Sequence, residues 1–229
     1  TDNSSNAGNT LTVTSFTVDT TGPTVTSVSS NTSNGSYNAS DNISVTVTFN
    51  ETVYVDNSSG NPRIQLETGT TDQYATYSSG NSSTVLVFNY TVQSGDISSD
   101  LDYKASYSLS LNSGTIKDSL NNDATLTLPS PGSSGSLSAN KAIIIDNTAP
   151  TSPSISINSG DNSTYSTSVT LTLSATDAVG VTGYYASENS TVSTSGWSIV
   201  DSATTFSDNV SFTLSSANDN KTVLFILKL

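Results

Sequence analysis

The sequence predicts an all-β protein made of two β-sandwich domains in tandem, and three observations support this. Apolar residues recur in short alternating runs between Gly, Asn and Ser turns, as in strands with one buried face. No stretch carries the i, i+3, i+4, i+7 apolar spacing of a helix across three turns. Finally, Val18-Asp19-Thr20-Thr21-Gly22-Pro23 recurs as Ile145-Asp146-Asn147-Thr148-Ala149-Pro150. In both copies an apolar strand ends at Asp, and Pro interrupts the ladder before the next strand begins.

These two junctions divide the chain into three parts. Residues 1–21 form a leading segment, residues 22–147 a first domain and residues 148–229 a second domain. In the first domain we predict strands at residues 24–29, 43–49, 52–55, 63–67, 73–77, 85–92, 106–111 and 141–145. In the second domain we predict strands at residues 154–158, 169–176, 181–187, 210–214 and 221–229. The second domain therefore has too few strands for a closed sandwich.

Composition excludes several classes of function. The chain has 229 residues and a net charge of −13 with only six Lys and Arg, which argues against binding nucleic acid or an anionic membrane. No run of 18 apolar residues is present, so we expect no membrane span. The sequence has no Cys and no His, which removes thiol chemistry and the commonest general base. No Gly-x-Ser-x-Gly motif occurs either, and we do not expect an enzyme.

The strand that ends the sequence needs a partner. Its apolar residues would form one wall of an acceptor groove, because an unpaired apolar strand exposes an edge that promotes aggregation. Read from end to start, this strand, the polar turn at residues 1–9 and the strand at residues 10–19 make one hairpin. We therefore expect the second domain to lack its last strand and the leading segment of another unit to supply it. The groove residues are Val223, Leu224, Phe225, Ile226 and Leu227.

The motifs that carry a resemblance to a known family are Leu66-Glu67-Thr68-Gly69 and residues 74–80, 90–96 and 114–118 in the first domain, and residues 168–177 and Trp197 in the second. The first domain resembles the immunoglobulin-like repeats that are strung in tandem along large prokaryotic surface proteins. The second domain is similar to another such repeat, whose last strand normally closes with Val-Asp-Thr-Thr-Ala-Pro. Here the turn and the final strand lie at residues 2–23, with Gly22 in place of Ala. The resemblance implies immunoglobulin-like folds, an extracellular location and a role in adhesion, stalks or fibres, with no catalytic residues.

The leading segment is predicted to be a donor strand. Leu11, Val13, Phe16 and Val18 would enter the core, with a bulge near Ser15 where the alternation slips. Only a short linker joins this strand to the first domain, and it cannot fold back over a whole sandwich to reach the second domain of its own chain. Insertion into an identical neighbour would build an open head-to-tail homopolymer, a surface filament such as a pilus. The alternative is one repeat of a giant covalent adhesin stalk, in which the same hairpin is continuous.

Thirteen Asn residues lie in Asn-x-Ser/Thr sequons, which permit N-glycosylation if the protein is exported. Bulky glycans would shield a fibre and block lateral strand pairing. The densest cluster, of four sequons, falls in an expected surface loop. The candidates we single out are Asn31, Asn34, Asn38, Asn42, Asn57, Asn81, Asn162 and Asn189.

Other ligand chemistry is weaker in the sequence. We expect no obligatory cofactor and assign no metal site, although linker carboxylates could bind calcium between domains as hard oxygen ligands. Tyr184, Tyr185 and Trp197 could form a sugar-binding platform, but core packing is the simpler interpretation. A recognition module would show an exposed aromatic cluster, whereas a structural spacer would show polar loops. The calcium candidates are Asp19, Glu51, Asp146, Asp177 and Asp219.

Overall fold

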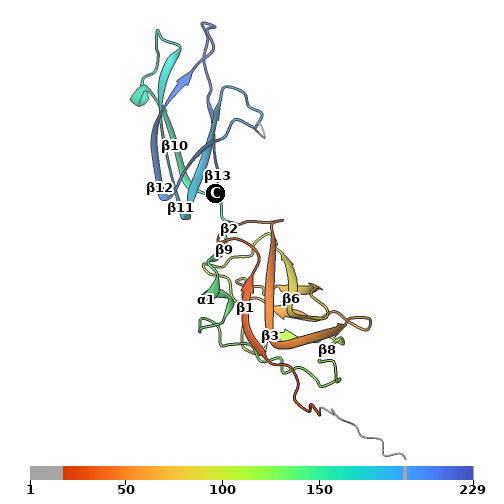
Figure 1. The fold of residues 1–229 in the computed structure, drawn as a ribbon. Coiled ribbons are helices and arrows are strands. Elements are labelled where there is room, and N and C mark those ends of the chain that lie inside the picture. Colours follow the sequence, from red (N-terminus) through yellow and green to blue (C-terminus); the bar gives the residue numbers. More distant parts are fainter. Residues whose placement is uncertain (1–17, 193–194, 229) are drawn as a thin grey trace, which may run out of the picture.

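A computed structural model describes residues 18–192 and 195–228 and confirms that the chain is all-β. Figure 1 shows two packed units that lie end to end and are joined by the segment around residues 146–150. Each unit has a hydrophobic core of its own. We call the unit built from β1–β9 the N-module and the unit built from β10–β13 the C-module. No helix in the described part of the chain is long and apolar enough to cross a membrane.

The N-module is built on a seven-stranded sheet with the order β1-β3-β6-β5-β4-β7, in which β8 pairs with β3. A separate two-stranded sheet pairs β2 with β9. The short helix α1 is capped by Ser136, whose Oγ accepts a hydrogen bond from the Ala139 backbone N–H. The elements are β1 (Val25–Ser30), β2 (Gly35–Tyr37), β3 (Asn42–Asp56), β4 (Arg63–Gln65), β5 (Tyr74–Ser79), β6 (Ser83–Thr91), β7 (Leu109–Ser110), β8 (Thr115–Lys117), α1 (Leu137–Asn140) and β9 (Ile143–Ile145).

Strand β3 is one long strand where the sequence predicts two. Its first half pairs with β1 and β6, and its second half pairs with β8, with a register shift between Thr48 and Val53. The apolar alternation breaks at Asn50 and Glu51, which is why the pattern suggests a turn. The backbone bends there without leaving the extended conformation, so one strand serves both sides of the sandwich.

Strand β9 closes the N-module. It runs parallel to β2, and on its other side Ile145 and Ser98 exchange two backbone hydrogen bonds of 2.8 and 2.9 Å. The Leu101 N–H also donates to the Ile143 carbonyl at 2.7 Å. Ile143 and Ile145 are fully buried, at 0% and 1% exposure. The last strand of the N-module is therefore held between two segments, one parallel and one antiparallel.

The C-module has a simpler four-stranded arrangement, in which β11 pairs with β10, β12 and β13. Two predicted strands, at residues 169–176 and 181–187, are one continuous strand that bends near residues 177–180. Strand β12 is much longer than predicted, because its first half is polar and exposed. The elements are β10 (Thr151–Ile157), the 3₁₀ turn η1 (Asn158–Gly160), β11 (Ser168–Ser187), β12 (Ser198–Thr213) and β13 (Leu224–Lys228).

The two cores differ in how completely they are closed. In the N-module, apolar side chains on β3 and β6 alternate between buried and half-buried or exposed positions, as expected for a two-layer sandwich. In the C-module only β11 carries a comparable row, with Leu171, Leu173 and Val181 at 0% exposure. No residue of β13 is fully buried, although four of its five are apolar. The C-module core is therefore open along β13.

Candidate strand-acceptor groove

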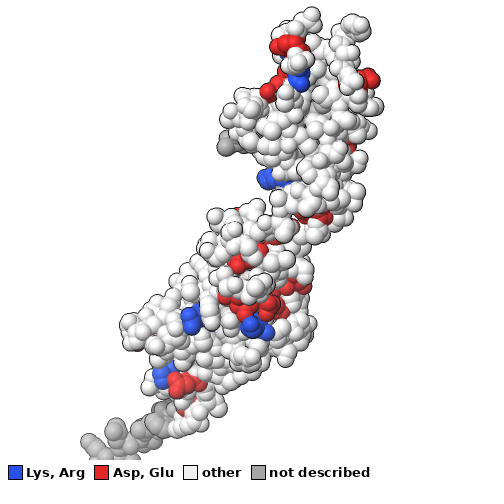
Figure 2. Space-filling view, turned by 180° about the vertical axis from the view of Figure 1, so that it is seen from behind, with Lys and Arg blue, Asp and Glu red and all other residues white. Residues whose placement is uncertain are grey.

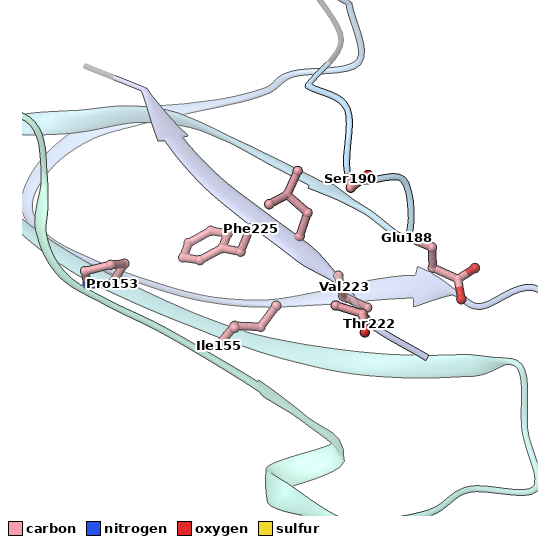
Figure 3. A pocket seen from close by; sticks show the side chains of 8 residues that line it. Pro153, Ile155, Glu188, Ser190, Thr222, Val223 and Phe225 are labelled. Carbon is pink, nitrogen blue, oxygen red and sulfur yellow. The ribbon is translucent and has the colours of Figure 1, made fainter. Parts of the chain in front are cut away.

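An apolar groove of about 380 Å³ runs beside β13. One wall is Val223, Leu224 and Phe225, and the other is Pro153 and Ile155 from the edge strand β10. Figure 3 shows Phe225, Val223 and Ile155 directed into the space between these two strands, with Glu188 at one end. The groove is an interruption in the sandwich wall, because β10 and β13 are edge strands of the same module.

Strand β13 has one paired edge among the described residues. Its register with β11 runs from Leu224 opposite Ser187 to Lys228 opposite Gly183. All five predicted groove residues, Val223, Leu224, Phe225, Ile226 and Leu227, are half-buried, and three of them pack against the C-module core. Half-buried apolar residues beside unpaired backbone N–H and C=O groups form a template for one more strand.

The sequence prediction identified only one wall of this groove. Pro153 and Ile155 were not predicted as groove residues, because β10 was expected as an ordinary sandwich strand. Pro153 could have revealed this wall from the sequence. Pro cannot donate a backbone hydrogen bond, so a Pro within a strand indicates an edge strand. Ser152, just before it, has a φ of 51°, and the β10–β11 register shifts between Thr151 and Ser154.

Three of the four predicted donor residues, Leu11, Val13 and Phe16, lie outside the described residues. The fourth, Val18, is 69% exposed. In the repeated junction Val18 corresponds to Ile145, which is 1% exposed in the N-module core. An apolar residue that precedes the same Asp is thus buried in one copy of the junction and exposed in the other.

The two junctions share a local hydrogen-bond pattern. Asp19 Oδ1 accepts from the backbone N–H and the Oγ1–H of Thr21, and Asp146 Oδ1 accepts from the same two groups of Thr148. These Asx turns fix the direction in which the chain leaves each strand. Asp146 Oδ2 is buried and has no hydrogen-bond partner in the described structure.

Each linker is attached to the N-module in a different way. At the second junction, Asn147 Nδ2 donates to the carbonyls of Gln93 and Asp96, and its Oδ1 accepts from the Ala39 N–H. At the first junction, Asn122 Nδ2 donates to the Asp19 carbonyl at 3.2 Å. Both linkers are thereby held at opposite ends of the N-module, the first beside the loop at residues 118–123.

Two of the predicted calcium candidates lie together. Carboxylate oxygens of Asp19, Glu51 and Asp118 all lie within 4.8 Å of one another. Burial alone would raise the pKa of the Asp118 carboxyl, but hydrogen bonds from Asn122, Leu120 and Asn121 outweigh it and lower the pKa below its ordinary value. Asp146, Asp177 and Asp219 do not join a three-carboxylate group among the described residues.

The eight singled-out sequon Asn residues are all exposed: Asn31, Asn34, Asn38, Asn42, Asn57, Asn81, Asn162 and Asn189. The side-chain oxygens of Asn34 and Asn81 each accept a hydrogen bond from a backbone N–H. The amide nitrogen, to which a glycan would be attached, therefore points away from these bonds. Figure 2 shows that uncharged residues make up most of one face, with few Lys and Arg. The surface is compatible with glycans, whose presence stays a prediction.

The aromatic residues proposed as a sugar platform pack within the C-module instead. Tyr185 is 9% exposed and its ring lies 5.9 Å from that of Trp197, while Tyr184 lies 6.0 Å from Phe206. The rings of Tyr107 and Tyr165 are exposed, but on different modules. These positions favour aromatic core packing over a binding platform.

Comparison with known proteins agrees with this architecture. No curated protein matches the chain. The described strands β1–β8 fall within residues 19–130, and this segment matches the family described as a bacterial Ig-like domain, a structural fold rather than a catalytic one. The N-module is thus similar to bacterial Ig-like domains over residues 19–130, which make up just under half of the chain.

Proposed function

We propose that this chain is a structural subunit of a bacterial surface filament whose units join by strand addition. Residues 1–20 of one unit supply a strand to the C-module groove of its neighbour. The observation that carries the proposal is the half-buried apolar edge of β13, which faces β10 across an open groove. Main-chain hydrogen bonds to β13 would provide affinity, and alternate apolar side chains would set the register.

The direction of the added strand follows from β13. Leu227 and Lys228, at the end of β13, border a pocket with Asn38 and Asn147 at the junction between the modules. A strand antiparallel to β13 therefore starts at this junction and runs toward the outer tip of the C-module. The N-module of the donor follows beyond that tip. Each added unit extends the row in the same direction, which gives an open head-to-tail filament.

The position of the first described residues supports insertion into a neighbouring unit rather than into the same chain. They lie at the end of the N-module farthest from the C-module (red in Figure 1). Pro23 is bound there, since its carbonyl accepts from the Thr125 N–H at 2.7 Å. The few residues between Val18 and Pro23 cannot span the length of the N-module.

The second candidate is a repeat of a covalent adhesin stalk. The observation that favours it is the repeated junction, whose Asp and Thr residues form the same turn at both ends of the N-module. In such an array the added strand would be the covalent continuation of β13. Both candidates produce the same completed sandwich and the same surface location.

The groove is tested by a peptide and two charged variants. A synthetic peptide of residues 10–20 should block self-assembly of the full chain, measured by light scattering and electron microscopy, while a scrambled peptide should not. Phe225→Asp should prevent assembly because it places a charge in the groove. Ile199→Asp is the matched control, since Ile199 is 72% exposed and outside the groove. Assembly that persists with Phe225→Asp would overturn strand addition.

Assemblies purified from their natural source distinguish a filament of separate subunits from a covalent stalk. Boiling in detergent should release subunit-sized chains from a filament of separate subunits, because only noncovalent strand pairing joins them. A covalent array would remain very large after the same treatment, and that result would favour the stalk.

A further inference from the structure

We infer that residues 162–165 form a third wall of the acceptor site and pair in parallel with residues 16–18 of the incoming strand. This inference rests on the proposed function, because it specifies how the donor is held once it enters the groove. The N-module provides the template, since it contains the same sequence motif in contact with its own last strand.

The motif occurs once in each module. Asn34-Gly35-Ser36-Tyr37 lies between the first strand β1 and the long strand β3, and Asn162-Ser163-Thr164-Tyr165 lies between β10 and the long strand β11. Both follow the first strand of the module and precede the strand that forms the centre of its core. The two segments thus have the same place in the order of elements.

In the N-module this motif forms β2 and binds β9. The Gly35 N–H donates to the Ala142 carbonyl at 3.0 Å, and the Asp146 N–H donates to the Tyr37 carbonyl at 2.9 Å. Asn34 adds a side-chain contact, because its Oδ1 accepts from the Ala142 N–H at 3.2 Å. Tyr37 is half-buried against the core and lies in register with Ile145.

In the C-module the same motif has no strand to bind among the described residues. Residues 161–167 are all exposed, and the fractional exposure of Tyr165 is 112%. The hydrogen bonds recorded at Thr164 are local ones with Ser166. A Tyr that is half-buried in one module is thus fully exposed in the other, where no described strand lies beside it.

The repeated junction then gives the register. Val18 corresponds to Ile145, so Tyr165 should lie beside Val18, as Tyr37 lies beside Ile145. The expected bonds are from the donor's Asp19 N–H to the Tyr165 carbonyl and from the donor's Ser15 N–H to Asn162 Oδ1. The position of Tyr165 agrees with this register. Tyr165 borders a cavity with Leu214 and Lys221 at the outer tip of the C-module, and the donor strand is expected to run toward this tip.

Cysteine cross-linking tests the register directly, since the chain contains no Cys. Thr17 and Thr164 would face each other as Ile144 and Ser36 do, within the Cα separation that a disulfide accepts. The full chain carrying Thr17→Cys and Thr164→Cys should form a ladder of intermolecular disulfides on oxidation. Thr17→Cys with Tyr107→Cys is the matched control, because Tyr107 is exposed on the N-module and should give no ladder.

A second measurement separates this inference from the proposed function. Tyr165→Ala should weaken binding of the residue 10–20 peptide about two- to fivefold by removing one aromatic–aliphatic cross-strand contact. If assembly proceeds but neither the ladder nor the weaker binding is found, the proposed wall at residues 162–165 is wrong and strand addition stands. If the chain neither assembles nor binds the peptide, strand addition itself is wrong.

Discussion

Asp118 organises the end of the N-module from which the leading segment departs. Its carboxylate accepts from the Leu120 and Asn122 N–H groups at 2.9 and 2.7 Å and from Asn122 Nδ2 at 2.7 Å. Asn122 Nδ2 also donates to the Asp19 carbonyl. One carboxylate therefore holds the side chain that positions the first linker, so the direction of this linker depends on Asp118.

Replacing Asp118 should lower the melting temperature of the N-module in a pH-dependent way. Because folding lowers the pKa of Asp118, its stabilising contribution is complete above the ordinary value of 3.8 and is lost as the pH falls below it. The difference in melting temperature between wild type and Asp118→Ala should shrink between about pH 5 and pH 2. Ser119→Ala, an exposed neighbour, is the control. A constant difference at all pH values would contradict this role.

Gly22 is required by a close backbone contact. The resembling repeats have Ala at this position, but here a Cβ would lie 1.9 Å from the Asp123 carbonyl oxygen. Gly22→Ala should therefore destabilise the N-module by about 1–3 kcal/mol, measured by chemical denaturation. Thr20→Ala is the control, since Thr20 is exposed in the same linker. An unchanged free energy of unfolding would show that the loop at residues 118–123 moves aside at little cost.

At the scale of elements, the bend in β11 lets one strand pair on both sides of the C-module. Gly180 has a φ of +128°, and the Gly180 and Val179 N–H groups both donate to Asp177 Oδ1 at 2.9 Å. An added Cβ at Gly180 would meet Ser202 Oγ at 2.2 Å. The bend therefore depends on a residue that tolerates both this φ and this contact.

Gly180→Ala should destabilise the C-module by about 2–4 kcal/mol, which combines backbone strain with steric crowding. Denaturation followed by the fluorescence of Trp197, the single Trp in the chain, reports on this module. Ala178→Gly is the control, because residue 178 is exposed beside the same bend. If Gly180→Ala lowers the free energy of unfolding by no more than Ala178→Gly does, the bend does not require glycine.

The elements also show where sequence patterns succeed and fail. Strands with apolar alternation, such as β6 and β10, were predicted within a few residues. The three-residue strands β2 and β8 were missed because such short segments show no period, and their pairing depends on distant partners. The β13 wall was predicted from its apolar run. The proposed wall at residues 162–165 could not be predicted from the sequence, because the motif there points to a strand partner only once the β2–β9 contact is known.

At the scale of the whole molecule, the two cores differ in size. Twenty-one buried apolar residues form the N-module core, whereas seven form the C-module core within the described residues. Buried apolar area is the main stabilising contribution, so the C-module should be the weaker unit. Completing its sandwich with a donor strand would stabilise it without changing the N-module.

Calorimetry of the full chain should therefore show two unfolding transitions, with the C-module unfolding first. Leu171→Ala should lower the first transition and Leu86→Ala the second, each by about 2–5 kcal/mol, because both side chains are 0% exposed in their own cores. A peptide of residues 10–20 at about one hundred times its dissociation constant should stabilise only the first transition, by about 2.7 kcal/mol. Self-association should likewise raise the first transition with protein concentration. If both transitions respond equally to the peptide, or if one transition accounts for all the heat absorbed, the modules are coupled and the groove is not an independent binding unit.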